Sequence, residues 1–248
     1  MMRERTRRKW ISGKRFFLAW LLLPIACTSI GFGNHPTALS SSRDIRRAPS
    51  DVKQIIIGLL PIIDYPLLSK FEQVMDVDFF SLDGTGANDD KLSALSKLNF
   101  SKLEGVSLLN CPAVTDEGIR HLAKIPSLKH LQLEGISITD AALGIMATNM
   151  SLTGVNVANI PKVTMQGLLK IGSSETLVSF TFSADNLTQD DVVRLIGEFG
   201  KNMRWPDVVD REGKLDASAL KALAKKKGIT LRVSRTGALQ NVVGGGGK

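Results

Sequence analysis

The sequence has few of the residues that build covalent crosslinks, metal sites or aromatic binding platforms. Its 248 residues include two cysteines, three histidines, three tryptophans and one tyrosine. Cys27 falls in an N-terminal segment that is expected to be cleaved, so no disulfide is predicted and the thiol of Cys111 is expected to be buried. No two histidines have a metal-ligand spacing, so no metal site is predicted.

Net charge is also small once the first residues are set aside. The whole chain has a formal net charge of +8. Residues 1–33 hold seven basic residues and one acidic residue, 7 − 1 = +6, so the rest of the chain carries 8 − 6 = +2. This distribution argues against a basic face for nucleic acid. Hydrophobic residues make up 43% of the chain, which is ample for the core of one domain.

The first 33 residues have the pattern of a targeting segment. A basic stretch precedes an apolar run over residues 16–30, about 15 residues long, which is typical of a signal peptide or a short signal anchor. A buried core helix and a mitochondrial presequence are the alternatives. Ile25 and Ala26 precede Cys27 as in the end of a bacterial lipobox, which would make Cys27 a lipidation site. We therefore expect export to the periplasm or cell envelope, with membrane contact only through this segment.

The clearest pattern in the chain is a repeated L-x-x-L-x-L motif that is followed, after a short turn, by a threonine. Corresponding residues of successive copies lie 25, 24 and 25 positions apart, and the threonines lie 24, 25 and 24 apart. Self-similarity at this period indicates a solenoid, in which each unit packs on its neighbours. The copies begin at Leu103, Leu128, Leu152 and Leu177, and their threonines are Thr115, Thr139, Thr164 and Thr188.

Each unit is predicted to contain a strand, a turn and a helix. The last apolar residues of the motif alternate with polar ones, as in a strand with one buried face. Threonine is a favourable N-cap, and the aspartates that follow it, such as Asp116 and Asp140, suit the positive end of a helix dipole. One unit cannot bury its own apolar stripe, so the units are predicted to stack with strands inside the curve and helices outside.

The motif resembles the leucine-rich repeats of the cysteine-containing, ribonuclease-inhibitor-like type. Such repeats occur in F-box-type proteins and in bacterial proteins with units reading LTDEGLKHL, and residues 114–122, VTDEGIRHL, are similar to that unit. Cys111 lies near the Asn/Cys position of the pattern, and the other turns depart from it with Ile136, Ile160 and Asn186. The resemblance implies an α/β leucine-rich-repeat solenoid over residues 77–233. It implies little about function, because this fold serves many partners.

The segments around the repeats are assigned from their composition. Residues 34–50, rich in Ser, Pro and Arg, are predicted to be a linker. Residues 51–76 carry a dense apolar set and are predicted to form a mostly helical N-terminal cap, with a second membrane-associated segment as the competing interpretation. Residues 234–248, which end in four glycines and a lysine, are predicted to be a disordered tail.

The repeats at the two ends are degenerate, and their register is predicted from spacing alone. At the N-terminal end, Phe80 is expected to lie level with Val106, which is 26 residues later. At the C-terminal end, Val208 lies 28 residues after Phe180 and is expected to be its equivalent in a sixth unit. Residues 228–233 are predicted to form a closing strand.

The outward-pointing residues of the strands form the candidate binding surface. They are mostly small, polar and uncharged, with no aromatic ladder for bases or sugars. A protein or peptide partner on this concave strand face is one interpretation, and a solvated face without a ligand is the other. The central row is predicted to be Ser81, Ser107, Gln132, Asn156 and Thr181, and Asp78, Phe79, Lys129 and His130 are predicted to belong to flanking rows. The residues expected to bind a partner are Lys129, His130, Gln132 and Asn156, with Ser107 and Thr181 beside them.

No enzyme activity and no cofactor are predicted. A Ser/His/Asp catalytic set needs a concave pocket assembled from several loops, which the short turns of a repeat array do not offer. The first functional hypothesis is an exported, monomeric, non-catalytic binding or structural module of the bacterial cell envelope. The alternative is an intracellular or mitochondrial leucine-rich-repeat adaptor or assembly factor. The version of this alternative that resembles the F-box proteins lacks a recognisable helical module before the repeats.

Overall fold

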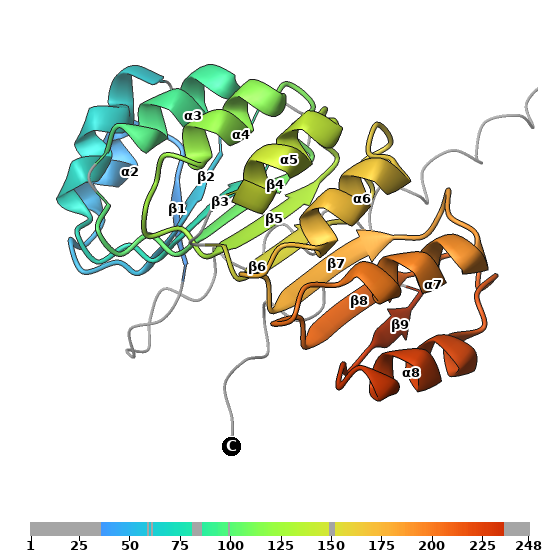
Figure 1. The fold of residues 1–248 in the computed structure, drawn as a ribbon. Helices are drawn as coiled ribbons and strands as arrows, with labels where there is room; N and C mark the ends of the chain where they lie inside the picture. The colour runs from blue at the N-terminus through green and yellow to red at the C-terminus, as the bar shows by residue number, and fades with distance from the viewer. Residues whose placement is uncertain are drawn as a thin grey trace, which may run out of the picture. The chain divides into compact units, whose positions relative to one another are not determined.

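The computed structural model describes residues 36–58, 60, 62–80, 86–98, 100–148 and 152–235, all in the unit of the chain from His35 to Lys248. The predicted targeting segment, Cys27 and most of the predicted tail lie outside the described residues. Within the described part, nine parallel strands form one sheet in sequence order, and a helix follows each of the first eight (Figure 1). Consecutive parallel strands require crossover connections, and these helices provide them.

The helices and strands have the following bounds. The strands are β1 (Thr37–Leu39), β2 (Gln54–Ile57), β3 (Asp76–Phe80), β4 (Gly105–Leu109), β5 (His130–Glu134), β6 (Gly154–Val157), β7 (Ser179–Ser183), β8 (Trp205–Val209) and β9 (Arg232–Ser234). The helices are α2 (Ser42–Arg47), the 3-10 helix η1 (Ile62–Lys70), α3 (Asp89–Ser96), α4 (Asp116–Leu122), α5 (Asp140–Thr148), α6 (Met165–Gly172), α7 (Gln189–Glu198) and α8 (Ala217–Lys226).

The core lies between the sheet and the helices, which follow one another along one face of the sheet (Figure 1). In β5, Leu131 and Leu133 are buried, whereas Gln132 between them is half-buried. Side chains of a strand alternate between the two faces, so the leucines point to the helices and Gln132 points away from them. The predicted α/β solenoid of stacked strand–helix units is therefore confirmed.

The turns after β4, β5 and β6 share one backbone conformation. Asn110, Gly135 and Asn159 occupy corresponding positions in three successive units and have φ values of 54°, 63° and 58°. Left-handed backbone is accessible to glycine and, among other residues, most readily to asparagine and aspartate. These residue types therefore allow the chain to turn sharply after β4, β5 and β6.

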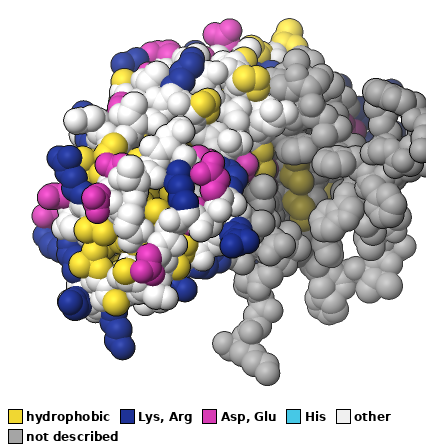
Figure 2. Space-filling model, turned by 90° about the vertical axis from the view of Figure 1, so that its right-hand side faces the viewer, with side chains coloured by type: hydrophobic (Ala, Val, Ile, Leu, Met, Phe, Trp, Pro, Cys, Tyr) yellow, Lys and Arg dark blue, Asp and Glu magenta, His cyan; other side chains and the backbone are white. Residues whose placement is uncertain are grey.

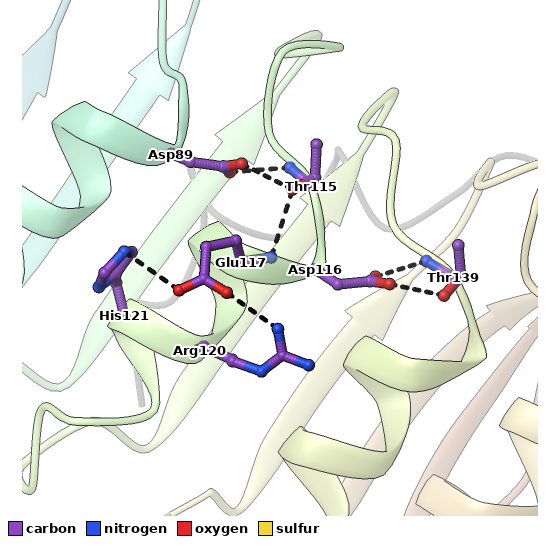
Figure 3. Close-up of polar contacts among 7 residues, drawn as sticks. All are labelled: Asp89, Thr115, Asp116, Glu117, Arg120, His121 and Thr139. Atoms are coloured by element: carbon purple, nitrogen blue, oxygen red, sulfur yellow. Dashed lines mark hydrogen bonds and ion pairs between the residues drawn. The ribbon is translucent and has the colours of Figure 1, made fainter.

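An aspartate at the start of one helix binds the threonine cap of the next unit. Asp116 accepts hydrogen bonds from the backbone nitrogen and the hydroxyl of Thr139, at 2.8 and 2.7 Å (Figure 3). Because the aspartate also lies at the positive end of its own helix, it stabilises two neighbouring units at once. The pairs with this geometry are Asp89–Thr115, Asp116–Thr139 and Asp140–Thr164.

The series of Asp–Thr pairs changes at α6. Met165 occupies the aspartate position there and has no carboxylate, so Thr188 of the next unit is bound by Asp191 of its own helix. Asp191 accepts from the backbone nitrogen and the hydroxyl of Thr188, at 2.9 and 2.7 Å. These hydrogen bonds lower the pKa of Asp191. The predicted threonine cap is therefore retained, but its acceptor comes from within the unit.

Replacing Asp116 with alanine should lower the free energy of unfolding by about 1–2 kcal/mol, because two hydrogen bonds between units are lost. Urea unfolding followed by circular dichroism measures the change. Asp190→Ala is the matched control, since Asp190 is exposed in the first turn of α7, and we expect about 0.5 kcal/mol or less for it. A double-mutant cycle with Thr139→Val should give a coupling of about 1 kcal/mol. Additive effects of the two substitutions would show that the bond between units contributes nothing.

The described residues of the predicted linker and cap differ from the prediction, because they form two further strand–helix units. Thr37–Leu39 pairs in parallel with β2, and Leu39 and Ile45 are fully buried. The Ser- and Arg-rich composition suggested a linker because α2 is short and buries only Ile45, so the segment has little apolar sequence. The predicted mostly helical cap contains β2 and a 3-10 helix that accommodates Pro66. Among the described residues, no helix has the length and apolar character needed to cross a membrane.

The register of the first predicted repeat is wrong by three residues. Val106 of β4 lies level with Val77, and Leu108 lies level with Phe79. Val77 and Phe79 are both fully buried, so packing against the helices selects these two residues. Asp78 therefore belongs to the central row of the opposite face, and Phe79 does not reach that face. Ser81, predicted for the central row, lies outside the described residues.

The register of the last predicted repeat is wrong by two residues. Phe180 pairs with Pro206, and Val208 pairs with Phe182. The additional residues lie in the turn before α8, where the buried carboxylate of Asp210 accepts from the backbone nitrogens of residues 214 and 215, at 3.2 and 3.0 Å. The closing strand β9 starts later than predicted and includes Ser234, which had been assigned to the tail.

Candidate binding surface on the strand face

The face of the sheet opposite the helices, called the strand face below, carries the candidate site. Pairing between β4, β5, β6 and β7 aligns one row along its centre, as the repeat spacing predicts. Pairing with β3 and β8 extends this central row at both ends. The central row consists of Asp78, Ser107, Gln132, Asn156, Thr181 and Asp207.

A second row lies two residues earlier in each strand and therefore on the same face. We call it the upstream row. It has Asp76 at one end and Trp205 at the other, and His130 lies among small residues between them. The upstream row consists of Asp76, Gly105, His130, Gly154, Ser179 and Trp205.

The residues predicted to bind a partner are not equally accessible. Lys129 and His130 are exposed, whereas Ser107, Gln132 and Asn156 are half-buried. The side chain of Thr181 is different, because the residue is only 7% exposed. A partner can therefore reach all of the predicted set except Thr181, which contributes little surface.

Lys129 forms an ion pair with Glu104 of the preceding unit. The Nζ of Lys129 lies 2.5 Å from Oε1 of Glu104, and the two side chains are 46% and 36% exposed. An exposed ion pair of this kind contributes about 0–1 kcal/mol to stability. Breaking it to bind a partner therefore costs little, and Lys129 remains a candidate contact.

The ring of His130 lies against Gly154 on the next strand. A Cβ added at Gly154 would lie 2.6 Å from Nδ1 of His130, too close for a real contact. Gly154 therefore permits the position of the imidazole, and a side chain at residue 154 would displace it. This contact places a ring at one side of the small residues in the upstream row.

Asn156 is partly committed to its own turn. Its Oδ1 accepts a hydrogen bond from the backbone nitrogen of Ala158 at 3.0 Å. The amide nitrogen of Asn156 is the part of the side chain that can donate to a partner. Asn156 therefore has a structural role as well as a place on the candidate surface.

Trp205 is the residue of this surface that the sequence interpretation missed. It is 60% exposed and lies beside Ser179 in the upstream row. The predicted alignment of Val208 with Phe180 would have made Trp205 equivalent to the buried Leu177. The exposure of Trp205 follows from the register of β8, which the degenerate spacing did not predict.

The two ends of the strand face differ in charge. At the N-terminal end, burial raises the pKa of Asp76, and the nearby Asp78 and Glu104 add to this. At the C-terminal end, Asp207 is 4% exposed and accepts hydrogen bonds from Arg232 and from the hydroxyl of Ser234. The hydrogen bond to Asp207 raises the pKa of Arg232. The charge of Asp207 is therefore balanced within β8 and β9.

The side of the molecule at the right of Figure 1, where α7 and α8 lie, has a mixed surface. Figure 2 shows basic, acidic and hydrophobic side chains interspersed on the part of this side that is not drawn in grey. A surface of mixed sign produces no extended basic field. This view therefore shows no basic patch of the kind that nucleic-acid binding requires.

Two hollows among the described residues are lined by turns rather than by the strand face. One, of about 120 Å³, lies between the turns that contain Asn159 and Asp185. The other, of about 410 Å³, lies beside the ends of α3 and α4 and includes Ser96 and Ser127. The hydroxyls of these serines donate to backbone carbonyls, so they are already engaged. Neither hollow assembles an activated nucleophile.

The titratable residues considered for chemistry lie apart from one another. Cys111 is fully buried, and burial raises the pKa of its thiol. His121 lies on α4, where its Nε2 is 3.5 Å from Glu117 (Figure 3), whereas His130 lies on the opposite face of the sheet. Among the residues that the structure describes, no group of three or more His, Cys, Asp or Glu residues could hold a metal ion.

Comparison with solved structures identifies the class of fold. A leucine-rich-repeat protein from Legionella pneumophila, LegL7, matches with a TM-score of 0.53 and 13% identity, over 77% of this chain and 71% of that one. A chain from the yeast Rad7–Elc1 complex matches with a TM-score of 0.47 and 18% identity, over 77% of this chain and 56% of that chain. This chain thus spans little more than half the length of that relative.

A third structure, the C-terminal domain of tropomodulin from Caenorhabditis elegans, matches with a TM-score of 0.34 and 14% identity, over 63% of this chain and 83% of that one. No protein-family model and no curated protein matches the sequence. The likeness to LegL7, together with the stacked parallel strands, shows an α/β solenoid of the leucine-rich-repeat type.

Proposed function

We propose that this protein is a non-catalytic binding module whose strand face holds a protein or peptide partner, and that it acts in the bacterial cell envelope after export. The observation that carries the binding proposal is the arrangement of the upstream row. His130 and Trp205 lie three strands apart, a separation of about 14 Å at the usual strand spacing. Gly154 and Ser179 lie between them, so no large side chain of the upstream row separates the imidazole, which lies against Gly154, from the indole.

The chemistry of this surface suits a polypeptide. Trp205 offers a large, rigid and exposed apolar side chain, and tryptophan is enriched among the residues that dominate binding energy at protein interfaces. Gln132, three strands away in the central row, offers a donor and an acceptor, and Lys129 adds a cation. A partner that covers the tryptophan and reaches Gln132 would bury apolar area and satisfy polar groups together.

The proposed partner site is tested by crosslinking from matched positions. A photoreactive amino acid is placed at Gln132 on the strand face or at Gln166, which is exposed on α6 of the helical face. We expect a discrete crosslinked partner from position 132 and none of the same size from position 166. Equal crosslinking from both positions, or crosslinking from position 166 alone, would move the interaction away from the strand face.

Export is supported by the basic stretch and the apolar run of residues 1–33. Fractionation followed by N-terminal sequencing of the mature protein tests this part separately. We expect a shortened or membrane-bound N-terminus in the envelope fraction. An intact N-terminus in the cytosol would instead support the intracellular adaptor, and the crosslinking result would still stand.

A further inference from the structure

The N-terminal end of the helical face carries a cluster of large apolar side chains in contact with water. Ile62, Ile63 and Leu67 of η1 are 41%, 84% and 37% exposed. Two other residues of the same helix, Tyr65 and Leu68, are buried in the core. Single exposed hydrophobic residues are common, but three of them on one short helix make that helix a candidate contact surface for something apolar.

Three arginines lie on the helix next to this cluster. Arg43, Arg46 and Arg47 of α2 are exposed, and their spacing of three and four residues places them on one side of the helix, away from the buried Ile45. We call Ile62, Ile63, Leu67 and the three arginines together the N-terminal patch.

A lysine side chain holds α2 and η1 together. Lys70, at the end of η1, donates from Nζ to the carbonyls of Ile45 and Ala48 at the end of α2, at 2.8 and 2.7 Å. The end of η1 therefore lies at the end of α2. The arginines of α2 and the apolar residues of η1 thus lie on two helices that contact each other.

The acidic residues nearby offset only part of this positive charge. Asp44 of α2 accepts hydrogen bonds from the backbone nitrogen of Ser40 and the hydroxyl of Ser41, at 3.0 and 2.9 Å. Asp64 of η1 is half-buried. Between Ser42 and Lys70 the chain has five basic and three acidic residues, 5 − 3 = +2.

We propose that the N-terminal patch rests on an anionic lipid surface. Ile62, Ile63 and Leu67 enter the boundary between headgroups and acyl chains, and the arginines of α2 bind lipid phosphates. Aliphatic side chains beside cationic ones are the combination that peripheral membrane surfaces use. The planar guanidinium groups of arginine bind phosphate oxygens in a bidentate manner.

The position of the patch in the chain supports a lipid surface over a protein partner. The apolar run of the targeting segment ends at Ile30, and β1 begins at Thr37, which is 37 − 30 = 7 residues later. Seven residues span at most about 25 Å. This step rests on the proposed membrane role of the targeting segment, because a retained segment would keep the patch within reach of the bilayer.

The test uses the full chain with a fluorophore that reports its local environment. Cys27→Ser removes one thiol, and the fully buried Cys111 is protected from labelling. The label is attached at Ile63→Cys, and the matched control carries it at Val193→Cys, an aliphatic position of α7 that is 39% exposed. Vesicles contain phosphatidylglycerol or only phosphatidylcholine, with a lipid-attached quencher. Sedimentation with the vesicles measures anchoring of the chain independently.

With anionic vesicles, the label at position 63 should shift to the blue and be quenched, and the label at position 193 should not. Replacing Arg43, Arg46 and Arg47 with glutamine should weaken this quenching about tenfold or more at low salt, since each cation near an anionic surface contributes several-fold. Sedimentation through the targeting segment should remain. Weaker quenching with unchanged sedimentation would distinguish binding by the N-terminal patch from anchoring by the targeting segment.

Several results would overturn the proposal. A chain that sediments with vesicles while position 63 stays in water retains its anchor but has no lipid-binding patch. Equal quenching at positions 63 and 193 would show nonspecific adsorption. A label at position 63 that is shielded without vesicles would assign the patch to a protein interface. Sedimentation that is lost in the arginine-to-glutamine variant would contradict the proposed anchor alone, because the patch would then be what holds the unchanged chain on the vesicles.

Discussion

Replacing Phe180 with alanine should lower the free energy of unfolding by about 3–5 kcal/mol, the usual cost of removing a buried phenylalanine. Phe180 of β7 is fully buried. Its ring centroid lies 5.2 Å from that of Phe182 and 6.4 Å from that of Phe199, so two ring contacts are lost with the apolar area. Urea unfolding of the variant beside the unchanged protein measures the loss.

Hydrogen exchange tests how far this damage spreads. In a solenoid each unit depends on its interfaces with its neighbours, so amides of β6 and β8 should exchange faster as well as those of β7. Phe180→Leu is the control, because it keeps most of the volume and should cost less than half as much. Loosening confined to residues 177–199 would contradict a stability that is shared between stacked units.

Replacing Trp205 with alanine should weaken binding of the partner captured through position 132 by about thirtyfold or more, equivalent to about 2 kcal/mol. The melting temperature should change little, because Trp205 is 60% exposed. Val193→Ala on α7 is the matched control, since it shortens an exposed apolar side chain on the helical face. An unchanged dissociation constant for Trp205→Ala would remove the tryptophan from the binding surface.

Tryptophan fluorescence gives a second view of the same contact. The other tryptophans, Trp10 and Trp20, lie in the predicted targeting segment and can be replaced with phenylalanine. The emission of Trp205 should then shift to the blue when the partner covers the indole. A binding curve without a spectral change would place the partner elsewhere on the surface.

The central part of the fold and of the candidate site could be predicted because its information is local. The spacing of 24 or 25 residues places Ser107, Gln132, Asn156 and Thr181 in one row, and the strand pairing has the same alignment. The threonine caps could be predicted for the same reason, since a side chain and a backbone nitrogen two or three residues away form each of them.

The links between units could not be predicted from one unit. Asp116 is favourable at the start of α4 on dipole grounds alone, but its hydrogen bonds to Thr139 depend on how the next unit stacks. The ring of His130 over Gly154 and the ion pair of Lys129 with Glu104 are also contacts between units. Their partners are about one repeat apart in sequence, and stacking brings them together.

The sequence by itself determined the repeat length, the order of strand, turn and helix, and the residues that cap the helices, because each follows from a pattern within a few residues. Only the tertiary structure decided the ends of the array. At both ends the L-x-x-L-x-L motif is degenerate, and burial against the neighbouring unit selects which residues face the core. Packing makes Val77 and Phe79 the inward residues of β3, adds β1 and β2 to the sheet, and places Trp205 on the strand face.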